Sequence, residues 1–405
     1  MLDIFFSYDF FPKIGGAHLW LYKVAYHWQR SCIYLTQEMP EMAREVTSFD
    51  AESHGPIKEI VRLPFCVSSW GIDKNFIKNT ALLHKFLSGL RKKEKVKQVT
   101  VHAVKAIPEA ANLLWLKFWL RDNLRLITYA HGEEFLVAKT SKELRWLARK
   151  ALEASDFVIA NSFSTAKLIE NLLGERSKAK ENKVIVVHLG VDFELYQLPK
   201  KERKTHRKAW GFPEEAVILI TVARMEPRKN QEAVIKAMAR LHQEGVPVAY
   251  VIAGSGEKEK ELKGLVERLG LKRWVRFLGR ISEEEKIKSI CAADIHVMPS
   301  IQIGPMIEGF GIVFMEAAAA GLPSIAGKVG GQPEAVVHGE TGLVVDGTNL
   351  DEIVWALKRL ATDKELRRKM GEQARTWAQK HDWKNISQRI FGEITTATTS
   401  PRDNR

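Results

Sequence analysis

Apolar residues in this chain come in short continuous runs, and many of these runs are followed by a segment with helical periodicity. Strands that are buried on both faces of a parallel sheet have this pattern, with helices as the crossovers. The pattern therefore predicts an α/β fold in which each half of the chain forms a doubly wound domain. The predicted strands are 4–7, 99–102, 126–129, 157–160 and 184–187 in the first half, and 217–222, 249–253, 275–278, 295–298, 323–326 and 342–345 in the second.

The alternation breaks in the middle of the chain, where a polar, Lys-rich stretch runs from Gln197 to Arg207. Polar stretches that contain Pro and separate periodic segments are typical of linkers. We expect an N-terminal domain over residues 1–195, a linker over 196–212 and a C-terminal domain over 213–382. A last helix over 383–395 is expected to cross back to the first domain, and residues 396–405 are expected to be disordered.

Composition narrows the class of protein. The 405 residues, of which 45% are apolar, suffice for two cores. The net charge of +13 is shared by both halves, which disfavours a dedicated nucleic-acid domain. Three cysteines stand far apart without His at metal-ligand spacing, as expected in a reducing cytosol. No apolar run could span a bilayer, and the first residues lack a signal sequence, so we expect a cytoplasmic protein.

Two segments raise the question of membrane contact. A basic cluster from Arg91 to Lys97 closes a helix predicted to begin near Asp73. This helix either packs its apolar face on the domain or lies on an anionic membrane surface. The segment 112–121 places Trp115 and Trp119 on one helical face. For this segment a buried helix is favoured over a membrane anchor.

The strongest candidate for chemistry is a glycine-rich turn bracketed by Glu308 and Glu316, followed by an Ala-rich helix. Gly309 and Gly311 leave backbone N–H groups open to a ligand, and a helix start favours phosphate. The two carboxylates are separated by up to about 12 Å. This span suits a ligand with hydroxyl groups at both ends and phosphate between them, as in a nucleotide sugar. The alternative is an ordinary helix start with an acidic cap.

Further candidates follow other predicted strands, where open parallel sheets bind ligands. In the second half, Arg224 and Lys229 could clamp a diphosphate. Each segment alone also has a structural explanation as a turn, a structural His or a solvated loop. The other candidates are Gly15 and Gly16 at a helix start, His131 after a first-half strand, and the turns with Gly254, Gly256 and Arg280 as walls for a base and ribose.

Taken together, these motifs resemble the retaining glycosyltransferases of family 4. The block 308–334, followed by 340–344, is highly specific for that family. The resemblance implies the GT-B fold, in which two Rossmann-like doubly wound domains face each other across a cleft. The segments 11–16, 131–134 and 308–313 look most like bacterial mannosyltransferases that glycosylate phosphatidylinositol lipids.

The resemblance also implies roles for single residues. Gly15 and Gly16 would approach the donor phosphates and the sugar, and His131 would contact the transferred hexose. Arg224 and Lys229 would hold the diphosphate, and Glu316 the nucleotide ribose. Glu308 would bind hexose hydroxyl groups, helped by backbone amides. The implied catalytic set is His131, Arg224, Lys229 and Glu308, and the further donor contacts are Gly254, Gly256, Arg280, Gly309, Phe310, Gly311 and Ile312.

The chain departs from the family pattern in its first domain. The usual Gly-His-x-Val after the first helix is replaced by residues 28–33, and the segment 38–65 does not align. Acceptors bind in that domain, so the acceptor stays open. An Asp-x-Asp motif does not occur in the sequence, which therefore requires no divalent metal. The family mechanism is a front-face transfer in which the leaving phosphate helps to deprotonate the acceptor, without a cofactor.

The leading hypothesis is the metal-independent, retaining transfer of a mannose- or glucose-type hexose. The donor would be a GDP- or UDP-hexose, and the acceptor a lipid or cell-envelope glycan at the inner membrane face, with no nucleic acid as partner. One alternative is the same fold with a soluble sugar or sugar-phosphate acceptor. The others are a non-catalytic protein that binds nucleotide sugars or polyanions, and an epimerase.

Overall fold

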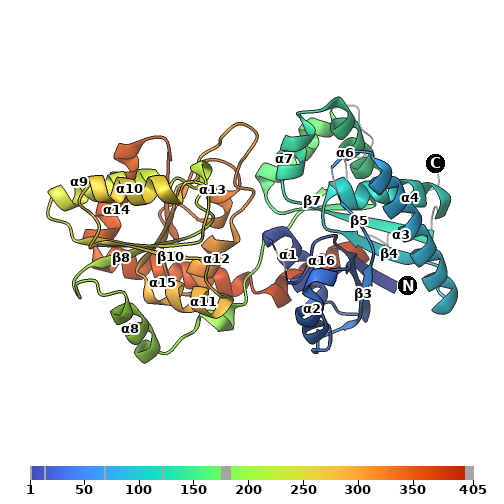
Figure 1. Ribbon diagram of the computed structural model, residues 1–405, viewed down its shortest axis with the longest axis horizontal. Helices are drawn as coiled ribbons and strands as arrows, with labels where there is room; N and C mark the ends of the chain where they lie inside the picture. Colours follow the sequence, from blue (N-terminus) through green and yellow to red (C-terminus); the bar gives the residue numbers. More distant parts are fainter. Residues whose placement is uncertain (1, 13–14, 68–69, 121–122, 175–183, 397–405) are drawn as a thin grey trace. The chain divides into compact units, whose positions relative to one another are not determined.

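The computed structural model describes residues 2–12, 15–67, 70–120, 123–174 and 184–396. The chain divides into two compact units, shown in Figure 1. Unit 1 comprises Met1–Leu189 with Trp383–Arg405, and unit 2 comprises Gly190–Asp382. The tail over residues 396–405 was expected to be disordered, and residues 397–405 of it lie outside the described ones.

Unit 1 contains a seven-stranded sheet in the order β3-β2-β1-β4-β5-β6-β7, and every pairing is parallel. The strand order reverses beside β1, as in a doubly wound fold. The sheet contains two strands, β2 and β3, that the sequence analysis did not predict. The strands are β1 (Leu2–Phe6), β2 (Cys32–Gln37), β3 (Ile57–Leu63), β4 (Val99–Ala103), β5 (Leu124–Ala130), β6 (Phe157–Ala160) and β7 (Val184–Val186).

Helices on unit 1 begin at recognisable caps. The side chains of Asp73, Ser141 and Ser162 accept backbone N–H groups at the starts of α3, α6 and α7. The α-helices are α1 (Gly16–Tyr26), α2 (Ala43–Asp50), α3 (Lys74–Lys93), α4 (Leu114–Leu120), α5 (Glu133–Ala138), α6 (Lys142–Ala154), α7 (Phe163–Leu173) and α16 (Trp383–Thr396). Short turns of helix are η1 (Pro40–Met42) and η2 (Ala106–Ala110).

The last helix, α16, packs in unit 1 although it follows the whole of unit 2 in sequence. The Ser387 hydroxyl donates to the carbonyl of Val24 in α1 at 2.9 Å. The guanidinium of Arg125 in β5 donates to the carbonyl of Ile394 at 2.7 Å. The helix that the sequence predicts to return to the first domain therefore forms part of unit 1.

Unit 2 contains a six-stranded parallel sheet in the order β10-β9-β8-β11-β12-β13. Its strands correspond to the apolar runs of the second half. They are β8 (Val217–Val222), β9 (Val248–Ala253), β10 (Val275–Gly279), β11 (Ile295–Met298), β12 (Ser324–Gly327) and β13 (Gly342–Val345).

Helices surround this second sheet and bury a core of aliphatic side chains against it. The α-helices are α8 (Lys200–Ala209), α9 (Gln231–Gln243), α10 (Glu259–Arg268), α11 (Glu283–Ala292), α12 (Ile312–Ala319), α13 (Gln332–Ala335), α14 (Leu350–Thr362) and α15 (Lys364–Lys380). Short 3-10 turns are η4 (Phe193–Tyr196) and η5 (Pro227–Lys229). The two parallel sheets confirm the predicted α/β class with two Rossmann-like domains.

Two details differ from the expectations. The stretch 196–212, expected to be a linker, contains helix α8 within unit 2. This helix is held by polar contacts, since Arg207 pairs with Asp294 at 2.7 Å. In unit 1, Trp115 and Trp119 of α4 are exposed, so the expectation that this segment forms a buried helix is wrong for the face that carries them. Within the described ranges, the structure has no helix of the length and hydrophobicity that a membrane span requires.

Candidate functional site

In unit 2, two cations converge on Glu308. Lys229 ends η5, directly after β8, and its ammonium contacts Oε2 of Glu308. Arg228 Nη1 donates to the same oxygen at 3.1 Å. Burial alone would raise the pKa of Glu308, but Lys229 and Arg228 outweigh burial and lower it. Glu308 is therefore a charged acceptor, held at a fixed position beside two positive side chains.

Arg224 occupies a different environment from Lys229, although both follow β8. Its side chain is 71% exposed and pairs with Glu226 at 2.6 Å. Glu226 also accepts from Nε of Arg228 at 3.1 Å, so it links the exposed arginine to the Glu308 cluster. Sequence reasoning missed Glu226 and Arg228. The alternating charges of Arg224, Glu226 and Arg228 were the signal that could have revealed this network.

The turn that carries Glu308 is tightly fixed by glycines. Gly311 has φ +88°, and a Cβ there would lie 2.7 Å from the ring of Phe314. A Cβ on Gly330 would lie 2.1 Å from the carbonyl oxygen of Glu308, and one on Gly331 would lie 2.0 Å from that of Gly309. Side chains at these positions would displace the turn. The glycines therefore hold the backbone of residues 308–311 at the start of α12, whose first residue is Ile312.

Glu316 lies in α12 and has a partner of its own. Its Oε1 accepts from Nζ of Lys286 in α11 at 2.7 Å, and Lys286 also pairs with Glu283 at 2.6 Å. The pKa of Glu316 is raised because its burial outweighs the attraction of Lys286. The two glutamates thus differ in their electrostatic state. Lys286 was missed by the sequence analysis because it is 30 residues away from Glu316 in sequence, and no linear pattern shows that the two side chains meet.

Gly254 and Gly256, predicted to contact the donor, are explained by packing inside unit 2. A Cβ on Gly254 would lie 2.1 Å from the carbonyl oxygen of Ala223, and one on Gly256 would lie 2.4 Å from that of Met225. Both glycines let the turn after β9 approach the loop after β8. Their contact with a donor stays a prediction, as does that of Arg280, an exposed residue directly after β10.

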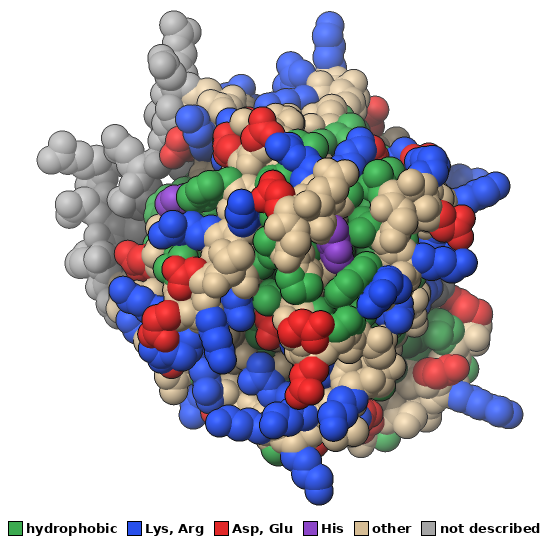
Figure 2. Space-filling model, turned by 90° about the vertical axis from the view of Figure 1, so that its left-hand side faces the viewer, with side chains coloured by type: hydrophobic (Ala, Val, Ile, Leu, Met, Phe, Trp, Pro, Cys, Tyr) green, Lys and Arg blue, Asp and Glu red, His purple; other side chains and the backbone are tan. Residues whose placement is uncertain are grey.

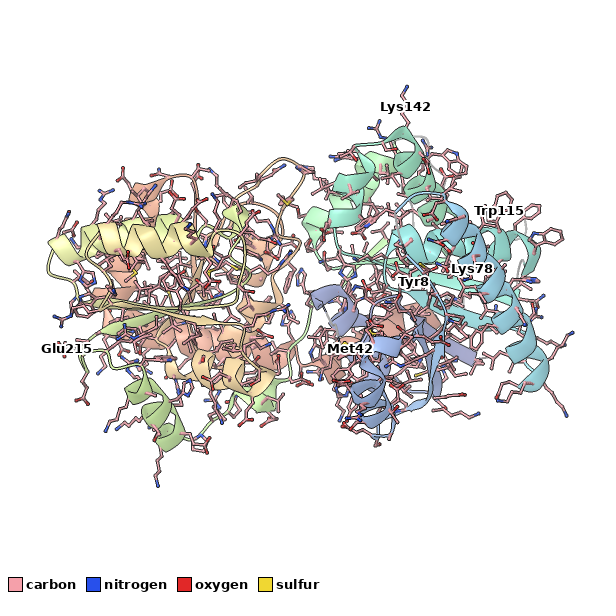
Figure 3. The ribbon with its side chains drawn as sticks, viewed as in Figure 1. Tyr8, Met42, Lys78, Trp115, Lys142 and Glu215 are labelled. Atoms are coloured by element: carbon pink, nitrogen blue, oxygen red, sulfur yellow. The ribbon has the colours of Figure 1, made fainter. Side chains whose placement is uncertain are left out.

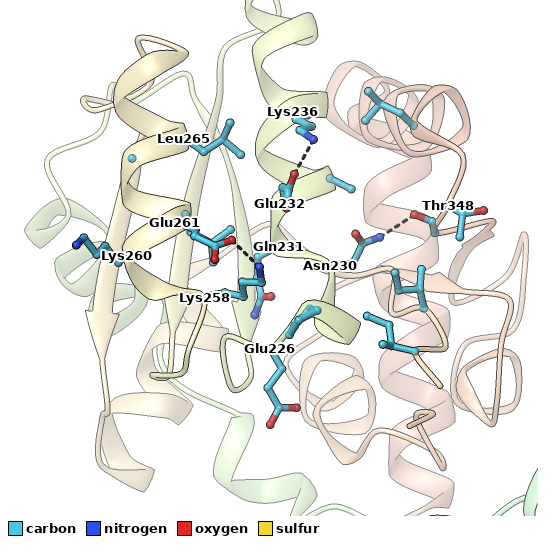
Figure 4. A pocket seen from close by; sticks show the side chains of 18 of the residues that line it. Glu226, Asn230, Gln231, Glu232, Lys236, Lys258, Lys260, Glu261, Leu265 and Thr348 are labelled. Atoms are coloured by element: carbon cyan, nitrogen blue, oxygen red, sulfur yellow. Dashed lines mark hydrogen bonds and ion pairs between the residues drawn. The ribbon is translucent and has the colours of Figure 1, made fainter. Parts of the chain in front are cut away.

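A hollow of about 610 Å³ opens on unit 2 between α9 and α10, as Figure 4 shows. Its rim carries charged pairs such as Lys236 with Glu232 at 2.6 Å. Glu226 lines the hollow, whereas Arg224, Lys229, Glu308 and Glu316 do not. The hollow is therefore a solvated groove beside the cluster and does not contain the residues predicted to bind the donor.

In unit 1, the predicted glycine pair lies at the start of α1. A Cβ on Gly16 would meet no protein atom within 4 Å, and one on Gly15 would meet only the His18 ring, at 3.7 Å. Packing within the described chain therefore does not require glycine at these positions. The first turn of α1 carries no acid, so the helix start keeps its affinity for an anion. Lys13 and Ile14 of this motif lie outside the described residues.

His131 follows β5 and is a neutral side chain. Its Nε2–H donates to the carbonyl of Val104 at 2.8 Å, which leaves Nδ1 as the acceptor of the ring. Burial and then the charge of Lys105 lower the pKa of His131 to about 3. The ring packs edge-on against Trp20 with centroids 5.1 Å apart. Histidine here can accept a hydrogen bond but is a weak base.

Two buried carboxyl groups, Glu109 and Glu134, lie in the same part of unit 1 as His131. Glu134 Oε1 accepts the backbone N–H of His131 at 2.9 Å, and Glu109 Oε1 accepts that of Tyr8 at 3.3 Å. Burial raises the pKa of each to about 7, although Lys105 lowers both. Within the described part of the chain, the second carboxyl oxygen of each acid has no hydrogen-bond partner. Sequence reasoning missed Glu109 and included Glu134 only as part of a motif.

In the described ranges, no three His, Cys, Asp or Glu side chains are grouped as metal ligands would be. That the activity needs no metal remains a prediction from the sequence.

Comparison with known proteins assigns the family. A profile described as glycosyl transferases group 1 matches residues 202–377, and one described as glycosyltransferase family 4 matches residues 29–195. A D-inositol 3-phosphate glycosyltransferase of Corynebacterium urealyticum is 30% identical over 305 residues, which cover 70% of each chain. The protein belongs to the family 4 glycosyltransferases, and the sequence-based assignment to this class of enzyme is confirmed.

Another relative is matched over a shorter part. A GDP-mannose-dependent alpha-(1-6)-phosphatidylinositol monomannoside mannosyltransferase of Mycobacterium tuberculosis is 35% identical over 190 residues. This match covers 46% of the present chain and 49% of the relative, so the chain spans about half of that protein.

Solved structures agree in fold. HepE of Anabaena, crystallised with UDP, matches with a TM-score of 0.77 at 21% identity and covers 98% of this chain and 100% of its own. The sucrose-phosphate synthase of Thermosynechococcus elongatus matches with a TM-score of 0.75 at 19% identity, covering 99% and 100%. The predicted GT-B fold is thereby confirmed.

Proposed function

We propose that this protein transfers a mannose- or glucose-type hexose from a GDP- or UDP-hexose to a lipid or cell-envelope glycan acceptor, with retention at the anomeric carbon. The observation that carries the proposal is the convergence of Lys229 and Arg228 on Glu308 at the start of α12. This cluster combines cations that can neutralise a diphosphate with a carboxylate that can bind hydroxyl groups.

The cluster can serve both ends of a donor's reacting bond. An ammonium has three donors, so Lys229 can hold Glu308 and a phosphate oxygen together. Glu308, kept ionised by its two cations, accepts hydrogen bonds from hexose hydroxyl groups. As the bond to the sugar breaks, negative charge grows on the leaving diphosphate, and Lys229 with Arg228 stabilises that charge. Arg224 is exposed and can turn from Glu226 to the same phosphate.

The remaining roles follow from the local environments. Glu316, held by Lys286, binds the ribose hydroxyl groups of the nucleotide. His131 accepts a hydrogen bond from the hexose through Nδ1, and its low pKa excludes it as the principal base. The acceptor proton therefore passes to the leaving phosphate, as in a front-face mechanism. In this proposal no metal or cofactor takes part.

Substitutions in unit 2 test the site. We expect Lys229→Ala and Glu308→Gln each to lower kcat/KM for hexose transfer by about 100-fold or more, because each removes a buried charged contact to the reacting group. The measurement is transfer from radiolabelled GDP-mannose, UDP-glucose and related donors to phosphatidylinositol. Lys236→Ala, an exposed lysine paired with Glu232, is the matched control. Wild-type rates in Lys229→Ala and Glu308→Gln would contradict the site.

A soluble acceptor is the second candidate. The relative that matches over 70% of both chains is named for D-inositol 3-phosphate, a water-soluble cyclitol phosphate. Parallel assays with phosphatidylinositol and with inositol 3-phosphate, followed by organic extraction of the labelled product, distinguish the two. Label in the organic phase supports the lipid acceptor. Label only in the aqueous phase supports the soluble one.

A further inference from the structure

Helix α4 of unit 1 turns its aromatic residues away from the fold. Its inner side is anchored, since Leu113 and Leu116 are buried and Nζ of Lys117 donates to Asp156 and to the carbonyl of Leu124, both at 2.6 Å. The opposite side is exposed, with exposed fractions of 61% for Trp115, 69% for Phe118 and 74% for Trp119. The i, i+3, i+4 spacing of these three residues puts them on one helical face.

A fourth exposed aromatic residue lies on a helix that packs against α4. Trp146 of α6 is 51% exposed, while the next residues in sequence, Leu147 and Ala148, are buried. Helix α4 packs against both α6 and α3. We call Trp115, Phe118, Trp119 and Trp146 the aromatic face. Figure 3 shows Trp115 pointing away from unit 1.

Basic side chains accompany the aromatic face. Helix α6 carries Lys142, Arg145, Arg149 and Lys150 as exposed residues, and α3 adds exposed Lys78. Arg149 and Lys150 both pair with Glu153 at 2.8 Å. The described residues form no ion pair with Lys142, Arg145 or Lys78. Figure 3 shows Lys142 projecting into solvent. By contrast, the side of the molecule seen in Figure 2 has Lys and Arg interspersed with Asp and Glu.

We propose that the aromatic face is a docking surface for an anionic lipid bilayer. Trp and Phe side chains partition into the boundary between lipid headgroups and acyl chains, and flanking Lys and Arg are attracted to anionic headgroups. The combination fits a bilayer better than a second copy of this chain. In a twofold dimer built on this face, the two sets of cations would face each other and repel.

The same structure limits the part played by the basic end of α3. Its apolar residues Phe76, Leu83, Leu87 and Leu90 are buried in the core of unit 1. Ile77, 64% exposed, is the large apolar side chain that α3 leaves exposed, so the helix has no continuous apolar face to insert into a bilayer. Its exposed lysines add electrostatic attraction only, and insertion falls to the aromatic face.

Vesicle binding tests this proposal without any sugar substrate, so its outcome is independent of the proposed function. The full chain is mixed with vesicles of phosphatidylglycerol and phosphatidylcholine and sedimented. We expect the triple variant Trp115→Ser, Phe118→Ser, Trp119→Ser to bind the vesicles at least about tenfold more weakly than the wild type, because most of the inserting aromatic area is lost. Trp355→Ser, which removes a 51% exposed tryptophan from α14 of unit 2, is the control. Equal binding by the triple variant and the wild type would overturn the proposal.

The role of the basic side chains is tested separately, with a variant that removes two positive charges. Lys142→Gln with Arg145→Gln is expected to weaken binding to anionic vesicles, and raising the salt concentration to weaken wild-type binding, because both reduce the same attraction. Pure phosphatidylcholine vesicles should bind poorly. The proposal would be contradicted if the wild type bound neutral and anionic vesicles equally well at all salt concentrations. It would also be contradicted if the wild type were a dimer and the triple variant a monomer. Far-UV circular dichroism and the melting temperature establish that the triple variant is folded.

Discussion

At the scale of single residues, the environment decides which charge a glutamate carries. Glu308 is buried against two cations, which lower its pKa, whereas Glu316 has one such partner and a raised pKa. Glu109 and Glu134 have no direct ion-pair partner among the described residues, and their pKa rises to about 7. Glu308 of unit 2 is thus a fixed anion, whereas burial in unit 1 shifts the titration of Glu109 and Glu134 toward neutral pH.

The buried acid Glu134 gives a prediction on pH. Its folded pKa lies above that of an unfolded glutamate, so the folded state holds its proton between about pH 4.5 and 7 while the unfolded state has lost it. Stability from this group is complete below that window and declines as the pH rises through it. Relative to wild type, Glu134→Gln should gain up to about 3 kcal/mol of unfolding free energy between pH 5 and pH 8.

Urea unfolding of unit 1, followed at several pH values, measures this difference. Glu133→Gln, which changes the exposed neighbour, is the control and should follow the wild-type pH dependence. The buried histidines His18 and His131 have lowered pKa values, so their contribution to stability rises with pH, in a lower pH range. This contribution cancels in the comparison because all three proteins contain both histidines. If Glu134→Gln and Glu133→Gln showed the same profile, the buried-acid assignment would be wrong.

At the scale of elements, the glycines of the candidate site fall into two kinds. Gly330 and Gly331 are required because the turn at Glu308 passes over them, whereas Gly16 begins α1 with open space at its Cβ position. Glycine that protein packing does not require leaves room for a ligand to approach the backbone. A glycine with open space at its Cβ position therefore indicates a functional role, and a glycine that packing requires indicates a role in folding.

Two alanine substitutions separate these kinds. Gly331→Ala should cost about 2–4 kcal/mol of unfolding free energy, because its Cβ would overlap the carbonyl of Gly309. Gly16→Ala should leave the melting temperature nearly unchanged, because alanine favours a helix, yet it should raise KM for the donor. Differential scanning calorimetry and donor titration measure the two effects. A large loss of stability in Gly16→Ala would show that its glycine is structural.

Sequence patterns predicted elements best where apolar residues are continuous. The buried strands of unit 2 were found, but β3 was missed because Lys58, Glu59 and Arg62 interrupt its apolar residues at the sheet edge. Helix α8 was missed because it buries no residue, so it has no apolar stripe for a periodicity to reveal. Its cohesion comes from polar contacts to α11 and its surroundings, which only three-dimensional structure shows.

The candidate site was predictable to a similar degree. Glu308 and Lys229 were both identified from the sequence, and the structure places them in direct contact. Arg224, expected to hold the diphosphate together with Lys229, pairs with Glu226, and the partner of Glu316 is Lys286 of α11. The pairings of Glu308 with Lys229 and of Glu316 with Lys286 join residues that are distant in sequence, and a linear pattern carries no information on which of many charged residues meet.

At the scale of the whole molecule, each unit has its own hydrophobic core, and the chain crosses between them twice. The second crossing delivers α16 to unit 1, where Trp383, Ile386, Ile390 and Ile394 are buried. Unit 1 is therefore completed only by the last segment of the chain. Damage to α16 should weaken unit 1 although the segment adjoins unit 2 in sequence.

Ile390→Ala tests this division of the molecule. The substitution removes buried methyl groups from unit 1 and should cost about 2–4 kcal/mol there, while the core of unit 2 keeps all its contacts. Hydrogen exchange followed by mass spectrometry reads the units separately, since β5 belongs to unit 1 and β9 to unit 2. We expect faster exchange in β5 and unchanged exchange in β9, with Gln388→Ala on the exposed side of α16 as the control. Equal loss of protection in both strands would show that the two cores unfold as one, because stabilisation that is confined to one core protects only the amides of that core.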